Sequence, residues 1–167
     1  WRRFAERSRR LLEGAGVDPD AELDPQHRRL SPSDFGFHNA LQDPEGRWSF
    51  VDFEYFGWDD PAKTLCDLLL HPRAGVPRRR RKSLVQARLR ALPGDLTLPH
   101  RLRAGYPLFA IQWSLILLNE FLPRERQRRR LASPEAERDA DRRPRQLRLS
   151  RNLLASLARD LEDSFLP

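Results

Sequence analysis

The run Asp43-Pro44-Glu45-Gly46 constrains the fold more than any other feature of the sequence. Each of its residue types is common at a particular position of a tight turn. Residues 39–41 precede the run, and residues 48–53 follow it with the aromatic and β-branched side chains that are typical of a strand. The sequence therefore predicts one short β-hairpin over residues 39–53.

Helical patterns dominate the rest of the chain. Apolar spacing and flanking Gly or Pro predict helices over residues 1–13, 61–70, 83–92, 106–122 and about 145–165. The last helix is expected to place on one face Leu147, Leu154, Leu157 and Leu161. Loops are expected at residues 15–27 and 30–34, and a mobile or surface segment at 124–143. The predicted fold class is α+β, mainly α.

Proline and aspartate set the expected helix ends. Asp60 can cap the free amides of a helix that begins at Pro61, because Asp accepts from them and Pro fits a first turn. That helix is expected to stop at His71-Pro72, and the most apolar helix to lie between Pro107 and Pro123.

Length and composition limit the class of protein. The 167 residues fit one domain, and 33% charged residues are typical of a soluble globular chain. The longest apolar segment, residues 108–118, is too short for a membrane span and contains Gln112 and Ser114. One cysteine, Cys66, excludes an internal disulfide and fits a reducing compartment, so we expect a cytoplasmic protein without membrane partners.

The net charge of +7 suggests a second class of function. Basic residues cluster at 78–82 and 128–130, as in a nucleic-acid-binding surface. However, both runs lie among Glu, Asp, Pro and Gln with few aromatic residues, so no base-stacking platform is apparent. Almost all of the basic residues are arginine, which suggests the codon usage of a GC-rich genome. A solvated surface is the favoured interpretation, and nucleic-acid binding stays the alternative.

Three polar residues around the hairpin carry the chemistry. Asp34 and Asn39 are separated by the spacing that kinases use between the catalytic Asp and a metal-binding Asn, and Asp52 begins a D-F-E element after the hairpin. Phosphoryl transfer needs a carboxylate beside the attacking hydroxyl and oxygen ligands for Mg²⁺. Paired strands would bring Asn39 beside Asp52.

The segments around these residues resemble the aminoglycoside phosphotransferase and choline kinase superfamily. The resemblance lies in Ser33-Asp34 through Asn39, in the run of residues 51–61 (V-D-F-E-Y-F-G-W-D-D-P), and in the later segments Gln112-Trp113 and 117–123. It implies a kinase-like C-terminal lobe over residues 1–167, with catalytic and metal-binding loops at 28–72 and a helical subdomain at 73–167.

The resemblance also implies a function and roles. Asp34 would be the catalytic base, and Asn39 and Asp52 the Mg²⁺ ligands, in transfer of a phosphoryl group from ATP to a hydroxyl of a small molecule. The substrate-binding residues, the acceptor, and the choice between ATP and GTP stay open. Pro32 stands where the family has histidine, and residues 1–33 contain no lysine and no glycine-rich phosphate loop. We therefore expect a catalytic half without its N-terminal lobe, and the chain, which has no methionine, to be a piece of a longer one.

Several alternatives remain at the level of sequence. The chain could be a degenerate kinase that binds a ligand without catalysis, which the proline at position 32 favours. His38 is expected to brace its own loop, Asp67 to accept hydrogen bonds from the catalytic loop, and Cys66 and Trp113 to pack in the core. The acidic set Glu54, Asp59 and Asp60 would either attract a cationic acceptor or serve in capping and solvation.

Overall fold

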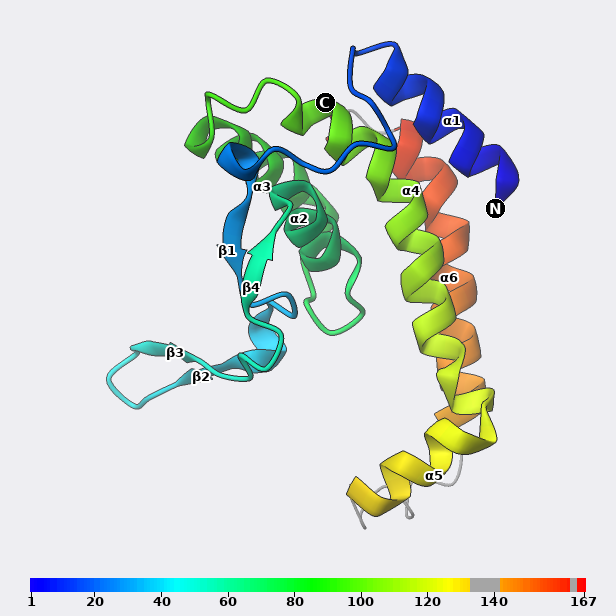
Figure 1. Cartoon of the computed structure of the whole chain (residues 1–167). Helices are drawn as coiled ribbons and strands as arrows, with labels where there is room; N and C mark the ends of the chain where they lie inside the picture. The colour runs from blue at the N-terminus through cyan, green and yellow to red at the C-terminus, as the bar shows by residue number, and fades with distance from the viewer. Residues whose placement is uncertain (133–141, 163–164) are drawn as a thin grey trace.

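The central element of the fold is helix α4 (Leu98–Leu117), against which three other helices pack. The computed structural model describes residues 1–132, 142–162 and 165–167. In Figure 1, α1 (Arg2–Glu13) and α6 (Arg142–Glu162) flank α4 on one side, and α2 (Pro61–Leu70) packs on the other. The fold is α+β and mainly helical, as the sequence predicts.

The hydrophobic core lies between α2, α4 and α6. Its fully buried side chains come mainly from the inner faces of α2 and α4, with α3 (Arg78–Ala91) adding Val85 and α6 adding Leu157. Cys66 is part of this core with no exposed surface, which confirms the predicted packing role, and burial raises the pKa of its thiol. The core therefore supports the end of α2, where the His71 ring stacks on that of His38.

The expected hairpin is present, and a second strand pair accompanies it. Strands β2 (Ala40–Gln42) and β3 (Trp48–Phe50) are antiparallel, with Ala40 opposite Phe50. The turn between them is closed by hydrogen bonds from the Asp43 amide to the Arg47 carbonyl (3.0 Å) and from the Gly46 amide to the Asp43 carbonyl (2.9 Å). The predicted second strand is shorter than expected, because it ends at Phe50 rather than at residue 53.

Strands β1 (Arg29–Ser31) and β4 (Gly57–Asp59) form the pair that the sequence did not indicate. β1 overlaps the loop predicted at residues 30–34, so that prediction was wrong at its start. Both strands are three residues long, and a strand this short does not show the alternation of apolar and polar residues by which strands are predicted. Figure 1 shows this pair beside α2, with the hairpin projecting beyond it.

Helix ends follow the capping signals in α2 and depart from them elsewhere. Asp60 accepts a hydrogen bond from the Ala62 amide (2.8 Å), which confirms its predicted role as the cap of α2. α3 begins at Arg78 rather than at residue 83, and α4 begins at Leu98. Pro107 is thus inside α4 and buried, where the sequence predicted a helix boundary. Tertiary packing on both sides of α4 outweighs the hydrogen bond that proline removes.

The segment after α4 is more regular than expected. A 3₁₀ turn, η3 (Leu118–Phe121), leads into α5 (Pro123–Ala132), so the first part of the predicted surface segment is helical. The remainder of that prediction, residues 133–141, lies outside the described residues. A further 3₁₀ turn, η1 (Pro25–His27), is the regular element within the predicted loop at residues 15–27.

The buried face of α6 differs in part from the predicted leucine face. Leu157 is buried and Leu161 packs against the core, as expected, but Leu154 is 45% exposed. Its neighbour Leu153 contacts the core instead. Within the described part of the chain, no helix combines the length and the apolar character that crossing a membrane requires.

Candidate active site

Two loops that carry the predicted catalytic residues face each other between the two small sheets. Residues 32–36 follow β1 and lead into the 3₁₀ turn η2 (Phe37–Asn39), and residues 51–56 follow β3 and lead into β4. Because β1 pairs with β4 and β2 pairs with β3, antiparallel ladders join the two loops at both ends. The Ser33 hydroxyl also donates to the Tyr55 carbonyl across the gap (3.0 Å).

Both loops contain a non-glycine residue in the left-handed region of backbone space. Ser33, immediately before Asp34, has a φ of 60°, and Asp52 has a φ of 65°. Such conformations cost free energy and concentrate at functional sites, where the surrounding structure enforces them. The left-handed Asp52 also explains why the strand ends at Phe50, since an extended ladder cannot continue through it.

Asp34 is held by side chains of its own loop. The His38 Nε2 lies 3.0 Å from Asp34 Oδ1, and the Asn39 Nδ2 donates to the Asp34 carbonyl (3.0 Å) and to Oδ2 (3.4 Å). The predicted bracing role of His38 is thereby confirmed. Asp34 and Asn39, which the sequence linked by spacing alone, are in direct contact.

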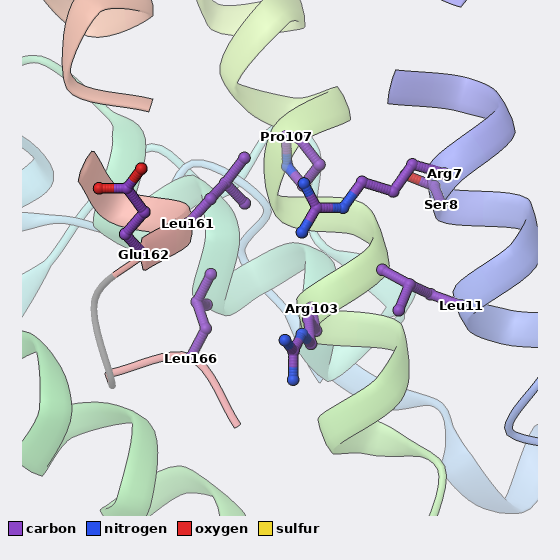
Figure 2. Close-up of a pocket in the computed structure, with 8 residues that line it drawn as sticks. All are labelled: Arg7, Ser8, Leu11, Arg103, Pro107, Leu161, Glu162 and Leu166. Atoms are coloured by element: carbon purple, nitrogen blue, oxygen red, sulfur yellow. The ribbon is translucent and has the colours of Figure 1, made fainter. Parts of the chain in front are cut away.

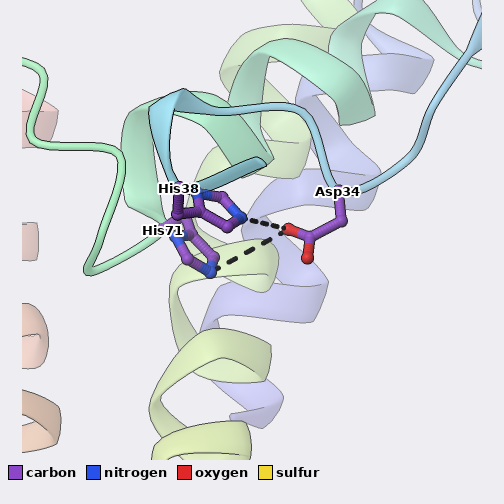
Figure 3. A group of neighbouring side chains, drawn as sticks. All are labelled: Asp34, His38 and His71. Atoms are coloured by element: carbon purple, nitrogen blue, oxygen red, sulfur yellow. Dashed lines mark hydrogen bonds and ion pairs between the residues drawn. The ribbon is translucent and has the colours of Figure 1, made fainter. Parts of the chain in front are cut away.

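His71, at the end of α2, approaches the same carboxylate from another element. Figure 3 shows its ring and that of His38 together beside Asp34. The two rings stack with centroids 4.0 Å apart and planes 12° apart, and His71 Nε2 lies 3.9 Å from Asp34 Oδ1. Burial, reinforced by the neighbouring His38, lowers the pKa of His71 to about 4. His71 Nδ1 accepts from the Arg73 amide (3.1 Å), so the neutral ring carries its proton on Nε2, toward Asp34.

The three side chains in Figure 3 also form a group with metal-ligand chemistry. One ligand atom from each of Asp34, His38 and His71 lies within 4.8 Å of the others. However, a histidine nitrogen binds a metal along a direction in its ring plane, and these two ring planes are nearly parallel. Their binding directions do not converge on one point, so the two rings serve as a support for the carboxylate, with His38 hydrogen-bonded to it and His71 stacked behind His38.

A chain of contacts connects this support to the core. The Trp113 ring meets His71 edge-on, with centroids 4.6 Å apart and planes 89° apart. Trp113 Nε1 donates to Asp67 Oδ1 (2.9 Å), and Lys63 Nζ donates to the other oxygen of Asp67 (3.1 Å). Asp67 was predicted to accept from the catalytic loop itself; its partners are instead Trp113 and Lys63, one contact further away. Burial raises the pKa of Asp67, while Lys63 opposes that shift.

The hairpin fixes Asn39 beside the backbone of Asp52. The Val51 amide donates to the Asn39 carbonyl (2.9 Å), so Asp52 follows directly after this bond. Ring contacts attach the hairpin to the segment that carries Asp34: the Phe35 and Phe50 centroids are 4.9 Å apart, and those of Phe37 and Trp48 are 5.8 Å apart. Asp52 itself is exposed.

The oxygen atoms near Asn39 and Asp52 fit the requirements of Mg²⁺. Asn39 uses its amide nitrogen on Asp34, which leaves its amide oxygen as an acceptor. The exposed carboxylate of Asp52 adds a second hard oxygen donor of the kind that Mg²⁺ prefers, with water and phosphate completing its shell.

The acidic set Glu54, Asp59 and Asp60 is mostly engaged in structural contacts. Asp59 pairs with Lys63 (2.8 Å). Asp60 caps α2 and also receives the guanidinium of Arg101 (3.0 Å). Capping and pairing therefore account for these two residues, and the exposed Glu54 is left as the member of the set facing solvent.

The first basic run is likewise partly structural. Arg78 and Arg81 both bind the carboxylate of Asp160, which is 1% exposed on α6. The phenol of Tyr106 donates to the same carboxylate (2.8 Å). This arrangement weakens the case for a nucleic-acid surface at residues 78–82, because two of its arginines bind the buried carboxylate of Asp160.

Three of the cavities differ in their relation to Asp34. An apolar one of about 520 Å³ adjoins the segment that carries Asp34 through Phe35 and Phe37. A second, of about 590 Å³, contains His71 and Trp113. The third, about 200 Å³, lies between α1, α4 and α6, where Figure 2 shows Arg7 and Arg103 around it. Neither the two facing loops nor His71 contributes to the lining of this third cavity, so it is remote from the candidate site.

Sequence reasoning missed His71 as a site residue and placed Trp113 only in the core. His71 served there merely as a helix stop, and no spacing rule relates it to Asp34, because only the docking of α2 brings the two together. A histidine directly after an apolar helix is a weak signal, but it was the one that the sequence offered.

Comparison of the chain with family models, with curated proteins and with solved structures gave no match. The kinase-like interpretation therefore rests on the motifs and on the geometry of the two facing loops.

Proposed function

We propose that this chain is the catalytic half of a phosphotransferase that moves the γ-phosphoryl group of ATP to a hydroxyl of a small molecule. The observation that supports this most strongly is the pairing of the two loops at both ends, which brings Asp34, Asn39 and the backbone of Asp52 into one short region. The glycine-rich cover and strand lysine of a complete nucleotide site would come from residues outside this chain.

In the proposed reaction, Asp34 orients the acceptor and takes its proton. The hydroxyl oxygen forms a bond to the γ-phosphorus, the bond from that phosphorus to the bridging oxygen breaks, and ADP leaves with the electron pair. The hydroxyl proton passes to the Asp34 carboxylate. His38 and Asn39 limit the rotation of that carboxylate, so that its position is set before the acceptor arrives.

Asn39 and Asp52 are the residues that would hold Mg²⁺. The bound ion would neutralise charge on the nucleotide phosphates. The support for this part of the proposal is the chemistry of the donors, an amide oxygen and an exposed carboxylate on neighbouring strand ends.

Replacement of Asp34 by Asn in the full-length protein tests the proposal. The change keeps the shape and the contact with Asn39 while removing the base, so transfer of labelled phosphate from ATP to a panel of hydroxyl compounds should fall by about 10²–10⁴-fold. Glu6→Gln, which removes an exposed carboxylate on α1, is the matched control and should leave turnover unchanged. Wild-type turnover in the Asp34→Asn protein would refute the role of this residue.

A degenerate kinase-like binding module is the second candidate, because Pro32 replaces the histidine of the family motif. It predicts that the full-length protein binds ATP in calorimetry yet transfers no phosphate to any member of the panel. The same experiment therefore separates the two functions.

A further inference from the structure

The cavity that contains His71 is a groove between the end of α2, the second half of α4 and the start of α6. Its volume is about 590 Å³, and we call it the α2/α4/α6 groove, with His71, Arg73, Trp113, Arg145, Gln146 and Leu149 among the residues that line it. The other cavity near the catalytic loop is lined by neither of the stacked histidines nor by Asp34. His71 connects the groove to Asp34, since its Nε2 lies 3.9 Å from the carboxylate.

The electrostatic character of the α2/α4/α6 groove is positive. Arg73, Arg142 and Arg145 line it, and its described lining contains no acidic side chain. Arg145 also lies in the first turn of α6, where free backbone amides add a partial positive charge. A basic residue at that end of a helix is unfavourable by itself, and an anion bound there would offset the repulsion.

Two further features describe the rest of a suitable ligand. Trp113, Ile116 and Leu149 provide an apolar wall, which suits a ring or carbon skeleton. The side-chain oxygen of Gln146 is buried, and among the described residues it has no hydrogen-bond partner. A buried acceptor without a donor is costly, and a ligand hydroxyl would satisfy it.

The charged residues around the site disfavour a cationic acceptor. The carboxylates of Asp59 and Asp60 already form ion pairs with Lys63 and Arg101, so they do not serve a cationic acceptor. Arg73 and Arg145 in the groove would repel an ammonium group.

From these contacts we infer that the α2/α4/α6 groove binds the phosphoryl acceptor, and that the acceptor is a small hydroxylated anion bearing a carboxylate or a phosphate. The arginines bind the anionic group, Trp113 contacts the carbon skeleton, and a hydroxyl is presented toward Asp34 past His71. The identification of the ligand as an acceptor rests on the proposed function, whereas its charge and its place of binding do not.

The test is calorimetric titration of the full-length protein with four probes of one carbon skeleton: gluconate, glucose 6-phosphate, glucose and glucosamine. Gluconate, glucose 6-phosphate or both should bind more tightly than glucose, and glucosamine should bind most weakly. The probe with the higher affinity identifies carboxylate or phosphate as the preferred group. Comparable or tighter binding of glucosamine, or no binding of either anion, would overturn the inference.

The Arg73→Gln/Arg145→Gln variant locates the binding site. Hydrogen bonds to charged groups are strong, so anion affinity should fall by about 10- to 100-fold for each arginine lost. Arg10→Gln, on the exposed surface of α1, is the matched control and should bind the anion as wild type does. Equal anion binding by the groove variant and the control would place the site elsewhere and contradict the inference.

The outcome for the groove can be separated from the outcome for the enzyme. The Arg73→Gln/Arg145→Gln variant tests the groove without altering Asp34, because Asp34 does not line it. Anion binding with the expected variants but without phosphate transfer would refute the proposed function and leave the binding site in place. Transfer to a cationic acceptor would support the function and refute the charge preference.

Discussion

The side chain of Asp160 links α6 to α3 and α4 through polar contacts. Its replacement should lower the stability of the fold, and this prediction is independent of the proposed function. Its carboxylate is 1% exposed and binds Arg78, Arg81 (3.0 Å) and the phenol of Tyr106 (2.8 Å). Burial, with the adjacent carboxylate, raises the pKa of the Tyr106 hydroxyl, so this phenol remains a hydrogen-bond donor throughout the ordinary pH range. Asp160→Ala removes the common partner of all three groups.

The expected loss follows from the burial of the groups left behind. The Arg81 side chain is 17% exposed and cannot regain full hydration, whereas that of Arg78 is 46% exposed and can turn to solvent. Removing one partner of a buried ion pair costs about 3–5 kcal/mol, which includes the orphaned charge. For a domain of this size, each kcal/mol lowers the melting temperature by about 2–4 °C, so we expect a decrease of roughly 6–20 °C.

Urea denaturation followed by circular dichroism would measure this loss. Tyr106→Phe removes one hydrogen bond and leaves the ion pairs, and it should cost only about 1 kcal/mol. Glu6→Ala, at an exposed position of α1, should have almost no effect. If Asp160→Ala costs less than about 1 kcal/mol, the carboxylate is not the buried link that its contacts indicate, and the reasoning fails.

Two further predictions concern the segment that carries Asp34 and the histidine beside it. A Cβ at position 36 would come within 2.7 Å of the His38 ring, so Gly36→Ala should destabilise the protein by about 1–3 kcal/mol and shift the NMR resonances of His38. Gly57→Ala is the control without that clash, because nothing lies within 4 Å of its added Cβ. Equal losses of stability in the two variants would contradict the close packing at Gly36. Because the folded protein lowers the pKa of His71 to about 4 while an unfolded chain has about 6.5, the unfolded state binds more protons between these values and stability should fall as pH drops through that window. A titration followed by proton NMR should give a His71 midpoint near pH 4, and His71→Gln should flatten the pH dependence of stability. A midpoint near pH 6.5 would show that the ring is not desolvated.

Local signals in the sequence determined much of the secondary structure. The turn at residues 43–46 specified the hairpin, because its residue types favour a tight turn between two strands. Asp60 and Pro61 specified the start of α2, since capping depends on residues within one turn of each other. The mainly helical class followed from apolar spacing. The spacing of Asp34 and Asn39 placed both residues in one short segment, whereas their direct contact was not predicted.

Other features depended on contacts between residues distant in sequence. Strands β1 and β4 are too short to have a pattern, and each exists because the other is present to accept its hydrogen bonds. Pro107 is inside α4 because burial between α1, α2 and α6 offsets a lost backbone bond. On α6, the polar Ser150 and Asp160 are buried and help to define the inner face, which a count of leucines alone could not locate.

In the candidate site, too, some features follow from the local sequence and others depend on tertiary contacts. The sequence by itself determined which loop carries Asp34 and which hairpin carries Asn39 and Asp52, because these residues lie close together along the chain. Only the tertiary structure decided that His71 and Trp113 support Asp34, and that Arg73 and Arg145 meet in one groove beside it. The physical reason is that such neighbours are set by the docking of α2, α4 and α6, which depends on the shape and burial of whole helices rather than on any local motif.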